Sequence, residues 1–219
     1  MSDKILIMPG RGSKTGVGGP PPIVEPGAKQ PEASQPPAPG GARKYVGAVA
    51  EGYDAKREQS SKWIAEQAAV EEMLDDLPAN SRILDIPIGT GRFIDYYRQR
   101  HFIVTGLDIS EDMLRLARQK VGGWDETFRF GLGNVLDLGI FEEMRFDAAV
   151  MVRLTRWLSP EDCTKAMQQL ARVTHGRIIF THRVNGEHPR PLDLFLMDGW
   201  LTNEREVQPG YYVTRMERA

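Results

Sequence analysis

The stretch that decides the fold class reads Ile83-Leu84-Asp85-Ile86-Pro87-Ile88-Gly89-Thr90-Gly91-Arg92-Phe93. Its first residues are apolar and typical of a buried strand, and its two glycines allow a tight turn and close approach of a ligand to the backbone. Asp108 follows Asp85 by 23 residues, at the end of the next expected strand, where a carboxylate can accept hydrogen bonds from both hydroxyls of a ribose. The stretch therefore indicates a nucleoside-containing ligand at a strand–turn–helix junction.

The position of Asp85 narrows the class of ligand. A carboxylate inside the turn repels a pyrophosphate, which disfavours a dinucleotide and favours a cofactor that carries a cationic amine and a sulfonium. The nicotinamide-binding pattern also requires a third glycine three residues after Gly91, where this chain has Ile94. The sequence contains no Gly-x-x-x-x-Gly-Lys loop, which excludes a nucleoside triphosphatase of that class.

Strand and helix patterns alternate along the rest of the chain. We expect strands at residues 82–88, 102–107, 128–132, 146–154 and 177–181, and helices at residues 56–77, 92–100, 110–120, 160–173 and 191–201. Two late strands, at 203–207 and 211–217, are joined by a hairpin turn. Strands that are apolar on both faces, such as the run from Ala148 to Val152, indicate a parallel sheet covered on both sides. The predicted fold class is α/β, with a seven-stranded, mostly parallel sheet, helices on both faces and a late antiparallel hairpin.

The composition excludes several classes of function. The 219 residues include 28 basic and 30 acidic side chains, and a net charge of −2 argues against bulk electrostatic binding to nucleic acid or to an anionic membrane. The single cysteine, Cys163, excludes a disulfide framework and a multi-cysteine zinc site, and it favours a reducing, cytoplasmic location. The apolar runs are too short to span a bilayer.

The first 44 residues differ from the remainder. They hold 9 of the 15 prolines and 8 of the 22 glycines, a composition that cannot build a helix or a strand ladder. We expect residues 1–44 to form a disordered tail and residues 45–219 to form one domain. The tail is either a simple solvated extension or a docking arm for a protein partner.

Four stretches together resemble class I S-adenosylmethionine-dependent methyltransferases: residues 84–91, residues 106–117, Gly133-Asn134-Val135-Leu136-Asp137-Leu138, and Phe146-Asp147-Ala148-Ala149-Val150. The resemblance covers residues 45–219, and the spacing of four motifs is more specific than any one of them. It departs from the family pattern at Pro87, which stands where the first glycine of the motif is usual. The resemblance implies a Rossmann-like fold, S-adenosylmethionine as the cofactor, and a methyltransferase domain at residues 45–219.

The resemblance also implies a set of cofactor-binding residues. Asp85 would face the methionyl amine, and the loop with Pro87, Gly89 and Gly91 would pass under the methionine. Asp108 would hold the ribose, and Ile109 would pack on adenine. Asn134 and Val135 would face the adenine edge, and Val152 would lie beside the sulfonium. Simpler structural roles remain open for three of them. Asp85 could be a turn cap, Asp108 a cap of the next helix, and Asn134 a loop-turn residue.

The acceptor side would lie after the fourth and fifth strands. Arg153, Arg156 and Trp157 follow the fourth strand, and His182 and Arg183 follow the fifth, with the region of Tyr53 closing over them. Two arginines suit a carboxylate or phosphate on the acceptor, and His182 could take the proton of the acceptor. The alternatives are surface ion pairs for the arginines and a backbone hydrogen bond for His182. No group of residues has the spacing of metal ligands, and methyl transfer needs no covalent protein nucleophile.

The leading functional hypothesis is a methyltransferase that acts on a small molecule by in-line methyl transfer. A protein or nucleic-acid methyltransferase that uses the tail for docking is the alternative within enzymes. The alternative outside enzymes is a non-catalytic binding or scaffold protein that keeps the fold.

Overall fold

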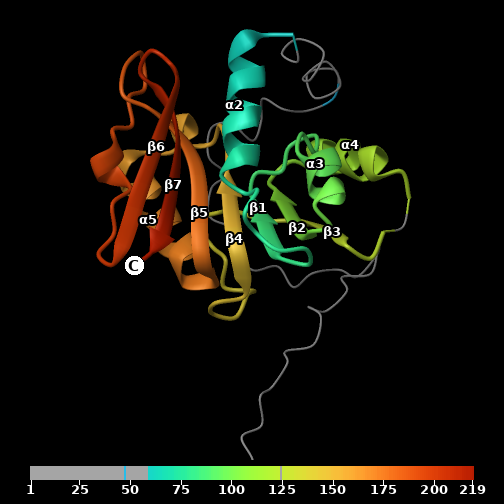
Figure 1. Ribbon diagram of the computed structural model, residues 1–219. Helices are drawn as coiled ribbons and strands as arrows, with labels where there is room; N and C mark the ends of the chain where they lie inside the picture. The colour runs from blue at the N-terminus through green and yellow to red at the C-terminus, as the bar shows by residue number, and fades with distance from the viewer. Residues whose placement is uncertain (1–46, 48–58, 124) are drawn as a thin grey trace, which may run out of the picture. The chain divides into compact units, whose positions relative to one another are not determined.

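The computed structural model describes residues 47, 59–123 and 125–219 (Figure 1). The expected tail at residues 1–44 and the region of Tyr53 lie outside the described residues. The same holds for the domain boundary at residue 45 and for the expected helix start at residue 56.

Seven strands form one sheet in the order β3-β2-β1-β4-β5-β7-β6, which can be followed across Figure 1. The strands are β1 (Arg82–Asp85), β2 (Ile103–Asp108), β3 (Phe128–Leu132), β4 (Phe146–Met151), β5 (Thr174–Arg183), β6 (Trp200–Gln208) and β7 (Tyr211–Arg218). Strands β1 to β5 pair in parallel, and β7 runs antiparallel to both of its neighbours, β5 and β6. The predicted fold class is confirmed, including the late hairpin.

Three of the four α-helices in the described residues begin after a capping serine, and α3 begins without a side-chain cap. They are α2 (Ser61–Glu72), α3 (Ile94–Gln99), α4 (Glu111–Val121) and α5 (Pro160–Val173), with single 3₁₀ turns η1 (Thr155–Trp157) and η2 (Leu192–Leu194). The hydroxyl of Ser110 accepts a hydrogen bond from the backbone N–H of Met113, at 3.4 Å, so the predicted cap of α4 is confirmed. Ser159 caps α5 in the same way, immediately before Pro160.

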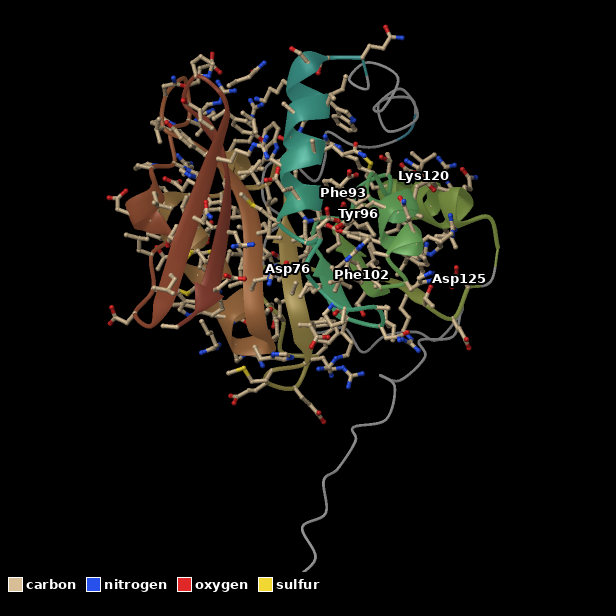
Figure 2. All side chains as sticks on the ribbon, in the orientation of Figure 1. Asp76, Phe93, Tyr96, Phe102, Lys120 and Asp125 are labelled. Atoms are coloured by element: carbon tan, nitrogen blue, oxygen red, sulfur yellow. The ribbon has the colours of Figure 1, made fainter. Side chains whose placement is uncertain are left out.

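Alternate residues of each strand supply two separate apolar layers. Ile83 packs with side chains of α2, α3 and α4 on one face, whereas Leu84 packs with α5 on the other. Figure 2 labels Phe93, Tyr96 and Phe102 in the first layer, where the ring centroids of Tyr96 and Phe102 are 6.2 Å apart. Both faces of the central strands are therefore buried, as a parallel sheet requires.

Three predictions of local structure were wrong. The helix expected at 191–201 is only the turn η2 followed by the start of β6, because Gly199, at φ +77°, breaks the chain direction before Trp200. The strand expected to reach residue 154 ends at Met151, since Arg153 adopts φ +63° and leaves the sheet. The strand expected to reach residue 88 ends at Asp85, shortly before Pro87, which has no backbone N–H.

Candidate active site

A cavity lies at the carboxyl ends of β1, β2, β3 and β4, with about 1000 Å³ of empty space that includes its opening into solvent. Its wall includes the residues that directly follow each of these strands, as expected for an open parallel sheet. Eight of the nine predicted cofactor-binding residues line it: Asp85, Pro87, Gly89, Asp108, Ile109, Asn134, Val135 and Val152.

Asp108 lies at the end of β2 and connects two segments of the cavity wall. Its carboxylate accepts hydrogen bonds from the backbone N–H of Gly89, at 3.0 Å, and from that of Ser110, at 2.9 Å. Only 5% of the residue is exposed, and burial raises the pKa of the carboxyl above its usual value although these N–H donors oppose the rise. Asp108 thus holds the glycine loop against the start of α4 and also faces the cavity.

Asp85 ends the neighbouring strand β1 and is 2% exposed. The Tyr97 hydroxyl donates a hydrogen bond to its carboxylate, at 3.0 Å. Burial, supported by the charge of nearby Asp108, raises the pKa of Asp85 to about 8, while the Tyr97 hydrogen bond opposes the rise. The Asp85 carboxyl is therefore mostly protonated at neutral pH, and a cationic group in the cavity would favour its ionised form.

The two glycines of the loop have different roles. Gly89, at φ +59°, lines the cavity, and a Cβ built on it would meet no atom within 4 Å, so its backbone is open to a ligand. Gly91, at φ +79°, does not line the cavity, and a Cβ there would lie 2.2 Å from Cδ1 of Ile94. Gly91 therefore permits the turn and the packing of α3 and is not among the residues that line this cavity.

The opposite wall is apolar. Ile109, Met113 and Val135 line it, and they offer the surface on which a purine ring can pack. Asn134 lines the same wall, but its side-chain oxygen accepts a hydrogen bond from the backbone N–H of Leu136, at 3.0 Å. Asn134 therefore has the loop-turn role that the sequence left open, and it also borders the cavity.

The donor set of this cavity fits S-adenosylmethionine. Two buried carboxylates stand at the ends of adjacent strands, one for an amine and one for ribose hydroxyls, and Gly89 allows a close backbone approach. The wall around Ile109 is apolar where a purine would lie. These groups are the ones that a cationic amino acid joined to a nucleoside requires.

Beyond Val152, the wall contains a buried ionic network that sequence analysis missed. Glu66 of α2 is fully buried, and its carboxylate accepts hydrogen bonds from Arg92, from Nε of Arg153 at 2.7 Å, and from the Tyr211 hydroxyl. Both guanidinium groups form cation–π contacts with the Trp63 ring: Cζ of Arg92 lies 3.7 Å and Cζ of Arg153 lies 4.6 Å from the ring centroid. One sequence feature could have revealed Glu66: it lies three residues after Trp63 and four before Val70, which places a glutamate on the apolar face of α2.

A second cavity adjoins the first, and Arg153 and Trp157 belong to the walls of both. Arg156, predicted on the acceptor side, lines the second cavity only. The backbone N–H of Arg153 donates to the hydroxyl of Thr181, at 2.7 Å, which holds the end of β4 against β5. Arg153 forms an ion pair with the buried Glu66, at 2.7 Å.

His182, predicted on the acceptor side, lies away from both cavities. It is 1% exposed and lines neither cavity. Its Nε2 lies 2.7 Å from a carboxylate oxygen of Glu204, and its Nδ1 lies 2.9 Å from the backbone oxygen of Arg190. Both ring nitrogens are thus engaged, and the side chain joins β5 to β6 and to the segment before η2.

Two findings concern other classes of site. Among residues 47, 59–123 and 125–219, no three side chains of His, Cys, Asp or Glu are placed to hold a metal ion. No helix in the same described part is long and apolar enough to cross a membrane.

Sequence comparisons agree with this geometry. The sequence model of the family described as "Methyltransferase domain" matches residues 83–176. The Bacillus subtilis protein YqeM, whose name places it among methyltransferases, is 41% identical over 64 residues, which are 29% of this chain and 22% of that protein. A methyltransferase-named protein of Geobacillus is 39% identical over 57 residues, 26% of this chain and 23% of that protein. The matched segment thus spans less than a quarter of either curated relative.

Solved structures share the fold over a much larger part of the chain. The magnesium protoporphyrin IX methyltransferase of Synechocystis, solved with bound S-adenosylhomocysteine, has a TM-score of 0.63 at 18% identity and covers 81% of this chain and 98% of its own. An N1-methyltransferase of Burkholderia thailandensis, solved with 1,6-didemethyltoxoflavin and S-adenosylhomocysteine, has a TM-score of 0.56 at 18% identity, with 77% and 83% covered. The chain thus has the fold of these S-adenosylmethionine-dependent methyltransferases, and its residues 83–176 match the methyltransferase domain.

Proposed function

We propose that the protein binds S-adenosylmethionine in the first cavity and transfers its methyl group to a small molecule. The observation that carries this proposal is the pair of buried carboxylates, Asp85 and Asp108, at the ends of adjacent strands around the open backbone of Gly89. The solved relatives that bind S-adenosylhomocysteine in the same fold support it.

The bound cofactor supplies a methyl carbon that its sulfonium already activates, so the protein has to bind and orient the two reactants. Asp108 would accept hydrogen bonds from the ribose hydroxyls. Asp85 would release its proton and face the ammonium group. The apolar wall at Ile109 would hold the adenine, and Val152 would keep water from the sulfonium side.

A small acceptor is favoured by the second cavity, which adjoins the first at Arg153 and Trp157. The Burkholderia relative was solved with a small heterocyclic substrate, in line with this class of acceptor. A protein or nucleic-acid acceptor, reached through residues 1–44 as a docking arm, is the alternative. A cytoplasmic location fits the single cysteine, which is buried and free.

Isothermal titration with S-adenosylmethionine and S-adenosylhomocysteine tests the proposal, with NAD⁺ and ATP as comparison ligands. We expect binding of the two adenosyl ligands only. Asp108→Asn should weaken it by about 10- to 100-fold, the loss expected for hydrogen bonds to a charged group. Asp95→Asn is the matched control, since Asp95 lies on α3 with 75% of its side chain exposed.

The melting temperature of each variant shows whether a loss of binding comes from unfolding. No heat and no thermal stabilisation with either adenosyl ligand at millimolar concentration would contradict cofactor binding. Equal affinities of Asp108→Asn and Asp95→Asn would mean that Asp108 only holds the loop.

A further inference from the structure

The wall of the second cavity is unusually basic. Its charged lining residues are Lys62 from α2, Arg153 and Arg156 from the segment after β4, Arg183 from the end of β5, and Glu187 and His188 beyond it. Four of these side chains, those of Lys62, Arg153, Arg156 and Arg183, are strongly basic, and one, that of Glu187, is acidic. The whole chain, in contrast, has a net charge of −2, so the positive charge is concentrated here.

Three of these cations lack acidic partners. Within the described part of the chain, Lys62, Arg156 and Arg183 form no ion pair with a carboxylate, although most arginines elsewhere in the fold do. They lie instead against aromatic rings. Nζ of Lys62 is 3.6 Å and Cζ of Arg183 is 5.3 Å from the centroid of Tyr211.

The third cation, Arg156, has its Cζ 4.9 Å from the centroid of Trp157. The buried carboxylate of Glu66 is already engaged by Arg92, Arg153 and Tyr211. Cation–π contacts of this kind leave the N–H donors of the exposed Arg156 and the half-buried Arg183 able to bind a further acceptor.

Burial and the neighbouring cations both act on Lys62. Burial, followed by the charges of Arg183, Arg153 and Arg156, lowers the pKa of Lys62 to about 8, while Glu66 partly opposes the fall. Arginine cannot lose its charge at working pH, so an anion bound in this cavity would reduce the repulsion between Arg153, Arg156 and Arg183.

We propose that the second cavity is the acceptor site and that the acceptor carries a carboxylate or phosphate group, which Lys62, Arg156 and Arg183 bind. This inference rests on the proposed function for the identity of the reaction. The position follows from the shared wall: Arg153 and Trp157 border both cavities, so a molecule anchored in the second lies next to the methyl end of the first. Planar guanidinium groups suit the two oxygens of a carboxylate and those of a phosphate equally.

The occupant is a small molecule and not a polymer, because the cations are gathered in one cavity and form no stripe for a phosphate backbone. Strand β6, beside β7, alternates acidic and basic side chains at Glu204, Arg205 and Glu206. The Trp157 and Tyr211 rings flank the cations and provide a surface for an apolar body behind the anionic group.

The test is a titration with benzoate, phenyl phosphate and the neutral analogue benzamide, in 150 mM salt, with and without saturating S-adenosylhomocysteine. We expect both anions to bind and benzamide to bind much more weakly. Arg156→Gln and Arg183→Gln should each weaken binding by about fivefold, and the double variant by about 25-fold. The matched control is Arg118→Gln, which removes the same charge from an exposed position on α4.

The ratio of the benzoate to the phenyl phosphate affinity shows which anionic group the acceptor carries. Equal binding of benzoate and benzamide, or equal losses in Arg156→Gln and Arg118→Gln, would overturn the proposal. Displacement of benzoate by a short single-stranded RNA at lower concentration would overturn the small-molecule assignment. The arm without S-adenosylhomocysteine keeps the two proposals separate: anion binding that persists when the adenosyl ligand fails to bind refutes the cofactor site and leaves the anion site in place.

Discussion

Substitution of Glu66 by glutamine should be strongly destabilising. The residue is fully buried, and its carboxylate is the counter-ion of two guanidinium groups, those of Arg92 and Arg153. Only 8% of the Arg92 side chain is exposed, and burial lowers the pKa of that guanidinium. Glutamine keeps the volume but leaves two cations without their anion. Breaking a buried ion pair by removing one partner costs about 3–5 kcal/mol, and because the amide oxygen still accepts one hydrogen bond we expect about 3 kcal/mol.

Urea unfolding followed by far-ultraviolet circular dichroism measures this free energy. Glu72→Gln is the matched control, because it makes the same change on the same helix in an exposed pair with Arg205, where the loss should be about 0–1 kcal/mol. A second readout is the affinity for S-adenosylhomocysteine, which should fall in Glu66→Gln because Arg92 and Trp63 line the first cavity.

A Glu66→Gln protein as stable as Glu72→Gln would refute the reasoning. It would show that solvent reaches the network and screens it as it screens a surface pair. Loss of stability without loss of cofactor affinity would instead separate the ionic network from the shape of the first cavity.

Three further outcomes are expected. Affinity for S-adenosylmethionine should rise by up to about tenfold per pH unit from pH 6 to about 8 and then level off. The reason is that binding a cation requires Asp85, whose pKa is raised to about 8, to lose its proton. Calorimetric titration in two buffers of different ionisation enthalpy measures the released proton. Affinity for benzoate should fall above about pH 8 as Lys62 loses its charge, and Lys62→Gln should remove that dependence in the same titration. Deletion of residues 1–44 should leave the melting temperature and the cofactor affinity nearly unchanged, since their composition cannot build a core, and a large drop in a thermal melt would contradict this.

The sequence was sufficient for features that depend on local pattern. The strand at 128–132 and the helix at 160–173 have the predicted bounds, since each is delimited by residues with strong conformational preferences, such as Ser159-Pro160 at the helix start. The first cavity was also predictable in outline, because a parallel sheet brings the residues after its strands to one edge. Asp85, Gly89 and Asp108 accordingly line one wall.

Features that depend on distant contacts could not be read in this way. His182 follows a strand end, as a site residue would, but its ring is oriented by Glu204, which is 22 residues away on β6. Glu66 could not be recognised for a different reason. A charge on an apolar helix face can be interpreted only when its partners are known, and here these are Arg153, from the segment after β4, and Tyr211, from β7. Sequence periodicity carries no information on such pairings.

The contacts of Glu66 with residues far away in the sequence have a practical consequence for protein engineering. The segment with recognisable family similarity, residues 83–176, contains Arg92 and Arg153 but neither Glu66 nor Tyr211. A chimera or fragment cut at those borders would retain two cations and discard the group that neutralises them. It would also end β5 after its third residue and lose β7, the strand that pairs with it. Cut points for a portable module therefore belong before Ser60, the cap of α2, and after β7.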